Sequence, residues 1–587
     1  MRSRDLTRLF LQRFVDNDLI SPEADRLQVL SQVFAVLITG GLFVSFFLSV
    51  PYLSSPYAMP SQTAANVVRV QFLCAAWSMT VMALLAVSVW DALALDSRDT
   101  QILGPLPLPR WIILRAKISA LVMFAAAFAA ALNVVPALMH PVLALSRLRP
   151  TLFQVITLIA AHVTSTTAAA AFGFLAVLGL RELLRAGLGA TSFRRISVVV
   201  RGLLVVALVT ILLLIPAMSF RIAGLWLQGA ADGTLLPPMW FVGLHDMLSG
   251  HIWAQLPRPD LPPVVARSER AFELMYQSRR SALQQLGLVG GATFVVVFLG
   301  SAAAYLWNNR RLPAPAFSRT AERGRVSATL ETIAQHVVAR RPIVRAGYFF
   351  TSRVLSRSVH NRLPIGVPLA VAIAVATVSL QVTGIASSLD FSSAPIPLLA
   401  VQLMLVTALA VGFRHSIRIP ADLHARWVFH LIRPANHSVY MAGVKRAAVV
   451  KLVLPVLIAL LPLHVLAFGA KTAIVHLGFG VFSALVLGQA VLLGYPRLPF
   501  ASSYVPTANI TTHGGIYALV FLVGVNSVAW VEHLALRTPS GTSALFIVTA
   551  MMFSAVRGIE IWQRRTPREV DLDELVDPPT LRLGLME

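Results

Sequence analysis

Residues 96–117 read DSRDTQILGPLPLPRWIILRAK, and residues 118–139 continue as ISALVMFAAAFAAALNVVPALM. The first passage has carboxylates, three prolines and a basic end, and the second has no charged residue. A hydrocarbon core of about 30 Å needs about 20 apolar residues in a spanning helix, which the second passage provides. The pattern predicts a membrane-spanning helix that is preceded by a polar interfacial segment.

The composition extends this prediction to the whole chain. Hydrophobic residues make up 57% of the sequence and charged residues only 13%, with a mean hydropathy of +0.73. A water-soluble fold could not bury so much apolar surface, so we predict an all-α polytopic membrane protein with about 12 transmembrane helices. The apolar runs cover approximately residues 27–50, 70–90, 118–139, 151–180, 202–220, 286–307, 364–387, 397–413, 447–470, 472–495, 514–531 and 543–562.

The positive charges predict the orientation of these runs. When the N-terminus is placed in the cytoplasm, 37 of the 49 Lys and Arg residues lie on the cytoplasmic side. This bias obeys the positive-inside rule, so both termini are predicted to be cytoplasmic. The net charge of +23 is then explained by membrane orientation, and we expect no nucleic-acid partner.

The spacing of the runs predicts two related six-helix halves. We expect a cytoplasmic segment at 1–26, a first half at 27–307, a basic connector at 308–363, a second half at 364–562 and a cytoplasmic tail at 563–587. Two parallel halves imply a pathway at the seam between them.

Two kinds of segment recur in both halves. The passage at 96–117 has a counterpart at 418–451, RIPADLHARWVFHLIRPANHSVYMAGVKRAAVVK, in which Asp, Pro and Lys follow in the same order. The matched positions are Asp96, Pro107 and Lys117 in the first copy, and Asp422, Pro434 and Lys445 in the second. An amphipathic segment precedes each half and is expected to lie along the cytoplasmic surface. Its apolar face has Leu6, Phe10 and Phe14 in the segment before the first half, and Ile343, Phe350 and Val354 in the segment before the second.

These features together resemble the ABC-2-type exporter permeases. The passages LDSRDTQILGPLPLPRWIILRAK (95–117), RAGYFFTSRVLSRSVHNRL (345–363) and LPFASSYVPTANI (498–510) are similar to passages of a fused twelve-span bacterial subgroup. A long segment between the fifth and sixth runs also agrees with that family, whereas the corresponding link in the second half is short.

The resemblance implies ATP-driven export from the bacterial cytoplasmic membrane, with hydrolysis by two separate ABC ATPase subunits that carry ATP and Mg. This chain has no G-x-x-x-x-G-K-[ST] motif, so we expect a transport subunit with neither enzymatic activity nor a cofactor of its own. Membrane lipids are expected partners, and pairing with a second permease chain stays open. The residues implied in ATPase coupling are Asp96, Arg98, Asp99, Arg110, Lys117, Asp422, Arg426, Trp427 and Lys445, and those considered for an external gate are Trp240, Phe241 and Trp253.

Two other classes were considered. An ion-coupled secondary transporter normally carries acidic groups near mid-membrane, and the central parts of the runs have none. The histidines in the runs, His162, His464 and His476, are interpreted as hydrogen-bonded packing residues, with a proton relay as the alternative. An intramembrane lipid-modifying enzyme would need motifs such as G-x-S-x-G or H-E-x-x-H, which the sequence lacks, and no metal site is expected.

Overall fold

The structure of the protein is a computed structural model that describes part of the chain. All regular secondary structure in this part is helical. The described residues are 3–15, 34–35, 37–42, 44–46, 60–95, 99, 103, 105–145, 151–228, 236–250, 263–310, 340–382, 395–421, 437–495, 497–501 and 510–563.

The chain divides into two compact units. The first comprises Met1–Asn17 and Glu23–Ser318, and the second comprises Asp18–Pro22 and Arg319–Glu587. The division falls within the basic segment that was predicted to connect two halves.

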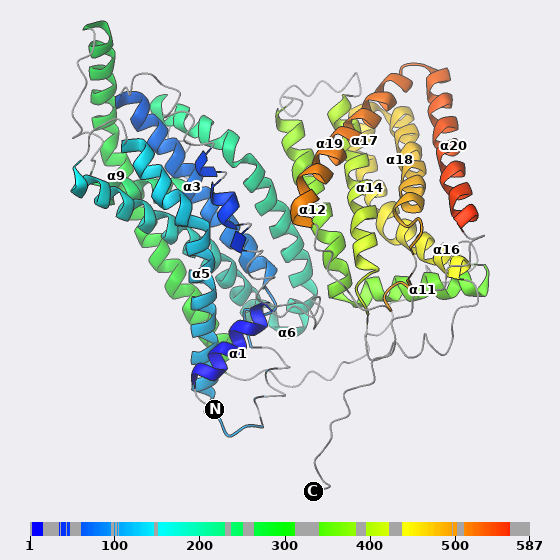
Figure 1. Ribbon diagram of the computed structural model, residues 1–587, viewed down its shortest axis with the longest axis horizontal. Helices are drawn as coiled ribbons and strands as arrows, with labels where there is room; N and C mark the ends of the chain where they lie inside the picture. The colour runs from blue at the N-terminus through cyan, green and yellow to red at the C-terminus, as the bar shows by residue number, and fades with distance from the viewer. Residues whose placement is uncertain are drawn as a thin grey trace. The chain divides into compact units, whose positions relative to one another are not determined.

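In the first unit, a short helix near the N-terminus is followed by long apolar helices (Figure 1). Small residues let these helices approach closely; for example, the backbone of Gly173 lies against the carbonyl group of Met79. The helices are α1 (Ser3–Val15), α3 (Pro60–Ser88), α5 (Arg110–Leu145), α6 (Leu152–Gln228), α7 (Pro237–Leu248) and α9 (Pro263–Asn309).

In the second unit, α11 and α16 lie together and run across the direction of α14 and α18 (Figure 1). A five-residue π-helix, η3 (Val449–Val453), joins α16 to α17, so a single long helix changes its hydrogen-bonding pattern there. The helices are α11 (Pro342–Arg357), α12 (Val359–Val382), α14 (Ile396–Ser416), α16 (His437–Ala448), α17 (Leu454–Phe468), α18 (Ala470–Val491), α19 (Ile510–Ala535) and α20 (Pro539–Gln563).

Ten helices within the described residues are long and apolar enough to cross a membrane. They correspond to ten of the predicted runs, and the first and eleventh runs correspond to the shorter apolar helices Leu37–Phe46 and Leu519–Ala535. The protein is therefore an all-α, multi-pass membrane protein, and the count of twelve stays a prediction.

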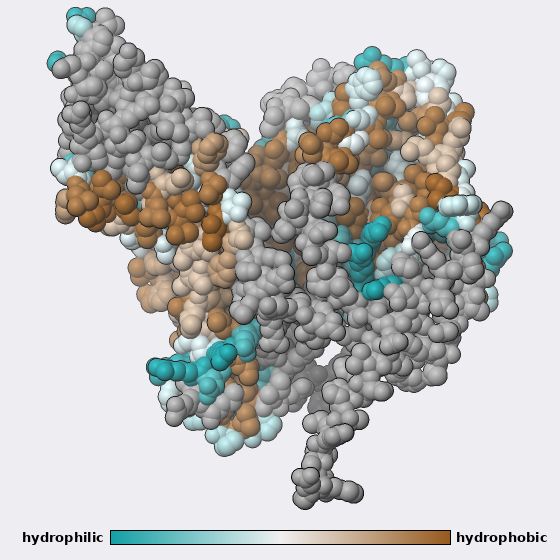
Figure 2. Space-filling view, in the orientation of Figure 1, coloured by the Kyte–Doolittle hydropathy of each residue, from teal (hydrophilic) through white to brown (hydrophobic). Residues whose placement is uncertain are grey.

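The outer surfaces of these helices are apolar. Exposed fractions reach 86% for Leu466, 77% for Phe153 and 69% for Val296. Hydrophobic residues cover much of the visible surface of the described helices (Figure 2). Contiguous apolar surface of this kind is costly in water and favourable in lipid, which agrees with the membrane assignment.

Some consecutive helices meet at a glycine without a longer loop. Gly469 ends α17 and begins α18 with φ 79° and ψ 160°, and Gly189 interrupts α6 with φ 69° and ψ 167°. This backbone region is essentially restricted to glycine, because a Cβ atom would clash with the neighbouring carbonyl oxygen. Gly469 therefore permits the chain to reverse direction within one residue.

The substitution Gly469→Ala should destabilise the second unit by about 1 to 3 kcal/mol, the cost of a strained backbone conformation. Thermal unfolding of the purified protein in detergent would measure the change. Gly524→Ala is the matched control, because a Cβ atom at this exposed helical glycine has open space around it. Equal unfolding midpoints for the two variants would show that Gly469 is not required at the joint.

Candidate functional site

The amphipathic helix α1 packs on α5, which contains the third predicted run. Leu6 and Phe10 are fully buried, in a cluster with Ile113, Ala116 and Ala120. The apolar face predicted from the sequence is thus the face that α1 buries.

Lys117 lies between α5 and this helix. Its side chain is 2% exposed, and its Nζ atom lies 4.8 Å from the ring centroids of both Phe10 and Phe14. An ammonium group over an aromatic face is attracted by the ring quadrupole, more strongly when water is excluded. Lys117 therefore holds α1 on α5, an intramolecular role that the sequence pattern did not reveal.

The second unit has a similar arrangement of α11 on α16. The backbone of Gly443 lies against the carbonyl oxygen of Val344, and Gly347 lies against that of Tyr440. A side chain at either glycine would separate the two helices. The buried face of α11 includes Val344 and Val354, whereas Ile343 is 39% exposed. That Ile343 shares an apolar face with Phe350 and Val354 along the cytoplasmic surface stays a prediction.

Lys445, at the end of α16, connects three helices. Its Nζ atom donates to Gln489 Oε1 on α18 and lies 3.0 Å from Glu560 Oε1 on α20. The other oxygen of Glu560 accepts from Arg557 Nη1 at 2.6 Å. Lys445 is 11% exposed on its side chain, so this cation also supports packing within its unit.

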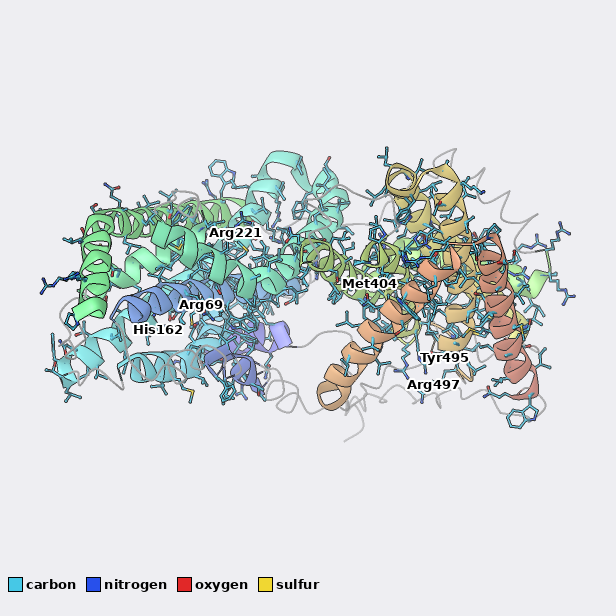
Figure 3. All side chains as sticks on the ribbon, turned by 90° about the horizontal axis from the view of Figure 1, so that it is seen from above. Arg69, His162, Arg221, Met404, Tyr495 and Arg497 are labelled. Carbon is cyan, nitrogen blue, oxygen red and sulfur yellow. The ribbon has the colours of Figure 1, made fainter. Side chains whose placement is uncertain are left out.

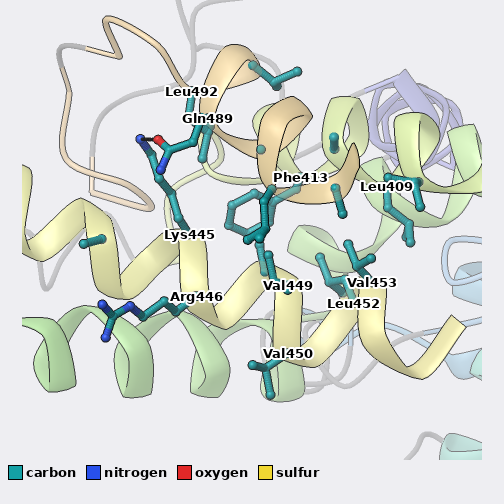
Figure 4. A pocket seen from close by; sticks show the side chains of 18 of the residues that line it. Leu409, Phe413, Lys445, Arg446, Val449, Val450, Leu452, Val453, Gln489 and Leu492 are labelled. Carbon is teal, nitrogen blue, oxygen red and sulfur yellow. Dashed lines mark hydrogen bonds between the residues drawn. The ribbon is translucent and has the colours of Figure 1, made fainter. Parts of the chain in front are cut away.

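A cavity of about 330 Å³ lies beside this ion-pair network (Figure 4). Its apolar lining comes from α14, α18, α20 and the π-helix, whereas cationic and amide groups gather at one side. An apolar chain with an anionic head would match this division between apolar and basic walls. The apolar lining includes Leu409, Phe413, Val449, Leu452, Val453 and Leu492, and the polar lining is Lys445, Arg446, Gln489 and Arg557.

The described residues contain no group of three or more His, Cys, Asp or Glu side chains arranged to hold a metal ion.

The remaining coupling residues are distributed unevenly. Asp99 is buried at 2% exposure, whereas Arg110 is exposed at the first position of α5. Beside Arg110, Trp111 is 60% exposed and Leu106 is 42% exposed. We call Leu106, Arg110 and Trp111 the 106–111 surface. Asp96, Arg98, Asp422, Arg426 and Trp427 lie outside the described residues.

Two of the residues considered for an external gate lie on α7. Phe241 is 1% exposed and makes an edge-to-face contact with Phe172, with the ring centroids 5.6 Å apart, and Trp240 contacts the same ring at 6.2 Å. The backbone of α7 also approaches α9 closely at Gly243 and Gly287. These aromatic residues are part of a packed helix pair, and Trp253 lies outside the described residues.

Sequence reasoning missed two buried carboxylates just beyond the ends of predicted runs. Glu532 is fully buried on α19 beside His476, and Glu182 is fully buried on α6 beside Arg181. The predicted runs stopped at 531 and 180 because charged residues were used as boundaries. Both helices continue past these positions, and tertiary partners make the burial possible.

Comparison of the chain with protein-family models, curated proteins and solved structures gave no match.

The substitution Lys117→Ala should loosen α1 from α5, because it removes the cation from between Phe10 and Phe14. A cysteine introduced as Leu6→Cys reports this opening by its rate of maleimide labelling in purified protein. The native Cys74 is buried and gives little background. Loss of a cation–π contact worth about 0.5 to 2 kcal/mol should raise the rate about 2- to 30-fold.

Lys451→Ala is the control for this experiment, because Lys451 is an exposed lysine in the other unit. An unchanged labelling rate in the Lys117→Ala variant would contradict the role assigned to Lys117.

Proposed function

We propose that this chain is the permease subunit of an ATP-binding-cassette exporter in a bacterial cytoplasmic membrane. It has twelve membrane spans in two related halves, both termini lie in the cytoplasm, and two separate ABC ATPase subunits supply ATP and Mg. The observation that carries the proposal is an arrangement of helices that recurs in the two units. In each unit an amphipathic helix packs on the helix that enters the third predicted span. That helix has a lysine, which is buried in the first unit (Lys117) and half-buried in the second (Lys445).

A second correspondence supports the duplication. In the first unit, Gln71 Nε2 lies 2.8 Å from His162 Nδ1, and in the second unit Gln402 Nε2 donates to the His476 carbonyl oxygen at 2.7 Å. Both pairs join the second and fourth predicted spans of their half. His162 is labelled in Figure 3.

The proposed mechanism is mechanical. ATP-driven closure of the partner subunits presses on the 106–111 surface and on the corresponding segment of the second half. Because α1 is fastened to α5 by Lys117, the two helices move as one body and transmit the displacement into the membrane. The two states of the ATPase must bind the permease differently for this movement to be driven.

The proposed cargo class is amphipathic or lipid-like. The cavity in the second unit supports it, because its walls are apolar and its basic side chains gather on one side. An anionic amphiphile suits both parts of this cavity.

The second candidate function is ion-coupled secondary transport. The buried Glu532 beside His476 favours it, since acidic groups inside membrane proteins commonly mark ion or proton pathways. A transporter of this class would work in vesicles without ATP, whereas the proposed permease would not.

The double substitution Arg110→Glu with Trp111→Ala should reduce capture of a co-expressed ABC ATPase by at least about tenfold, because it reverses a charge and removes an exposed aromatic anchor. Affinity co-purification from detergent-solubilised membranes would measure the capture. The partner to be co-expressed is the Walker-motif ATPase that the proposal expects in an adjoining reading frame.

Trp530→Ala is the matched control, since Trp530 is 53% exposed on α19, in the other unit. Absence of a Walker-motif ATPase in the adjoining frame, or equal capture by the double variant and the parent protein, would contradict the proposed function.

A further inference from the structure

Four helices of the second unit bring polar side chains together in an otherwise apolar interior. They are Gln402 on α14, His464 on α17, His476 on α18 and Glu532 on α19, and each is 0% exposed. We call these residues the buried polar cluster. Around it lie apolar residues of the unit's core, including Phe479, Val525 and Leu545.

The geometry joins these side chains into one group. His476 Nδ1 and Glu532 Oε1 are 2.6 Å apart, the distance of a strong hydrogen bond. The ring of His464 meets that of His476 edge to face, with centroids 4.7 Å apart. The amide of Gln402 donates to the His476 carbonyl oxygen and thereby fixes the α18 backbone beside the pair.

Several atoms of the cluster have no hydrogen-bond partner among the described residues. These atoms are Gln402 Oε1, both ring nitrogens of His464, His476 Nε2 and Glu532 Oε2. Buried polar atoms are usually paired, because an unpaired one loses its interaction with water. A concentration of such atoms at one place is more characteristic of a binding site than of a packing contact.

The positive charges of the neighbouring elements do not contact Glu532. Of the ionisable groups on the helices packed around it, Lys471 is exposed and His533 is bonded to Arg537. On α14, Arg414 and His415 lie more than three helical turns beyond Gln402. On α20, Arg557 and Glu560 lie as far beyond Leu545, toward the end of the helix. In the described structure, the ionisable side chain that the carboxyl group contacts is His476, and His464 contacts His476 in turn.

The hydrogen bond between His476 and Glu532 requires a proton between the two atoms. If the carboxylate were ionised and both imidazoles neutral, the cluster would carry a net negative charge in an apolar interior, at high cost. One additional proton makes the cluster neutral. With the carboxyl group protonated, its O–H donates to His476 Nδ1, and no separated charges remain buried.

We propose that Glu532, His476 and His464 form a proton-binding site in the second unit, with Glu532 as the bound-proton carrier and His464 as the second base. On release, the Glu532 O–H bond breaks as the His476 Nδ1–H bond forms. The two imidazole rings then turn from their edge-to-face contact, so that a nitrogen of His464 accepts from His476 Nε2–H. The His476 Nε2–H bond breaks as His464 takes up that proton, which leaves a carboxylate, a neutral His476 and a protonated His464. His464 then passes the proton to water, and the sequence reverses on binding.

This site does not depend on the proposed ATPase coupling, since it concerns the chain alone. Infrared spectroscopy of the purified full-length protein in lipid nanodiscs, between about pH 5 and about pH 9, detects the carbonyl stretch of a protonated carboxyl group. We expect one such band per chain at neutral pH that is lost in Glu532→Gln. In His476→Gln the band should move to higher frequency, because the carboxyl group loses its strong acceptor.

Glu182→Gln is the matched control, because Glu182 is a buried carboxylate that contacts Arg181 and accepts from Asn308 at 2.8 Å. It should leave the band unchanged. Absence of the band at neutral pH, or its persistence in Glu532→Gln, would overturn the proposal. If Glu532→Gln does not fold, an unshifted band in folded His476→Gln protein would overturn it equally.

Discussion

The structure depends on one constraint: inside a lipid bilayer, a polar group must find its partner within the protein. Backbone groups satisfy this requirement through helices, which explains why the described secondary structure is entirely helical. Polar side chains satisfy it through contacts between helices, as Lys117 does with two aromatic rings and Lys445 does with Glu560. These few contacts hold neighbouring helices together.

The short amphipathic helices α1 and α11 are held in place by their contacts with long helices. α1 and α11 are too short to span a membrane, yet each buries an apolar face on a long helix. A force on the exposed residues beside such a pair acts on both helices at once. In the proposed exporter, this coupling connects a soluble ATPase to segments within the membrane.

Much of the fold could be predicted from local sequence, and much of the site could not. Apolar runs give helix length directly, so ten predicted runs have counterparts among the spanning helices. The burial of Lys117 requires α1 to fold back onto α5, which no local pattern specifies. Glu532 was treated as the end of a run, because a carboxyl group inside lipid is unfavourable until His476 is brought beside it.

The most direct test of the proposed permease function is to measure which energy source drives the conformational change. A cysteine introduced as Trp240→Cys on α7 can be labelled in proteoliposomes that contain the chain alone or the chain with its ATPase. We expect the labelling rate to change only when ATP and the ATPase are both present. A change driven by a proton gradient across vesicles that contain the chain alone would contradict the assignment as a passive permease subunit.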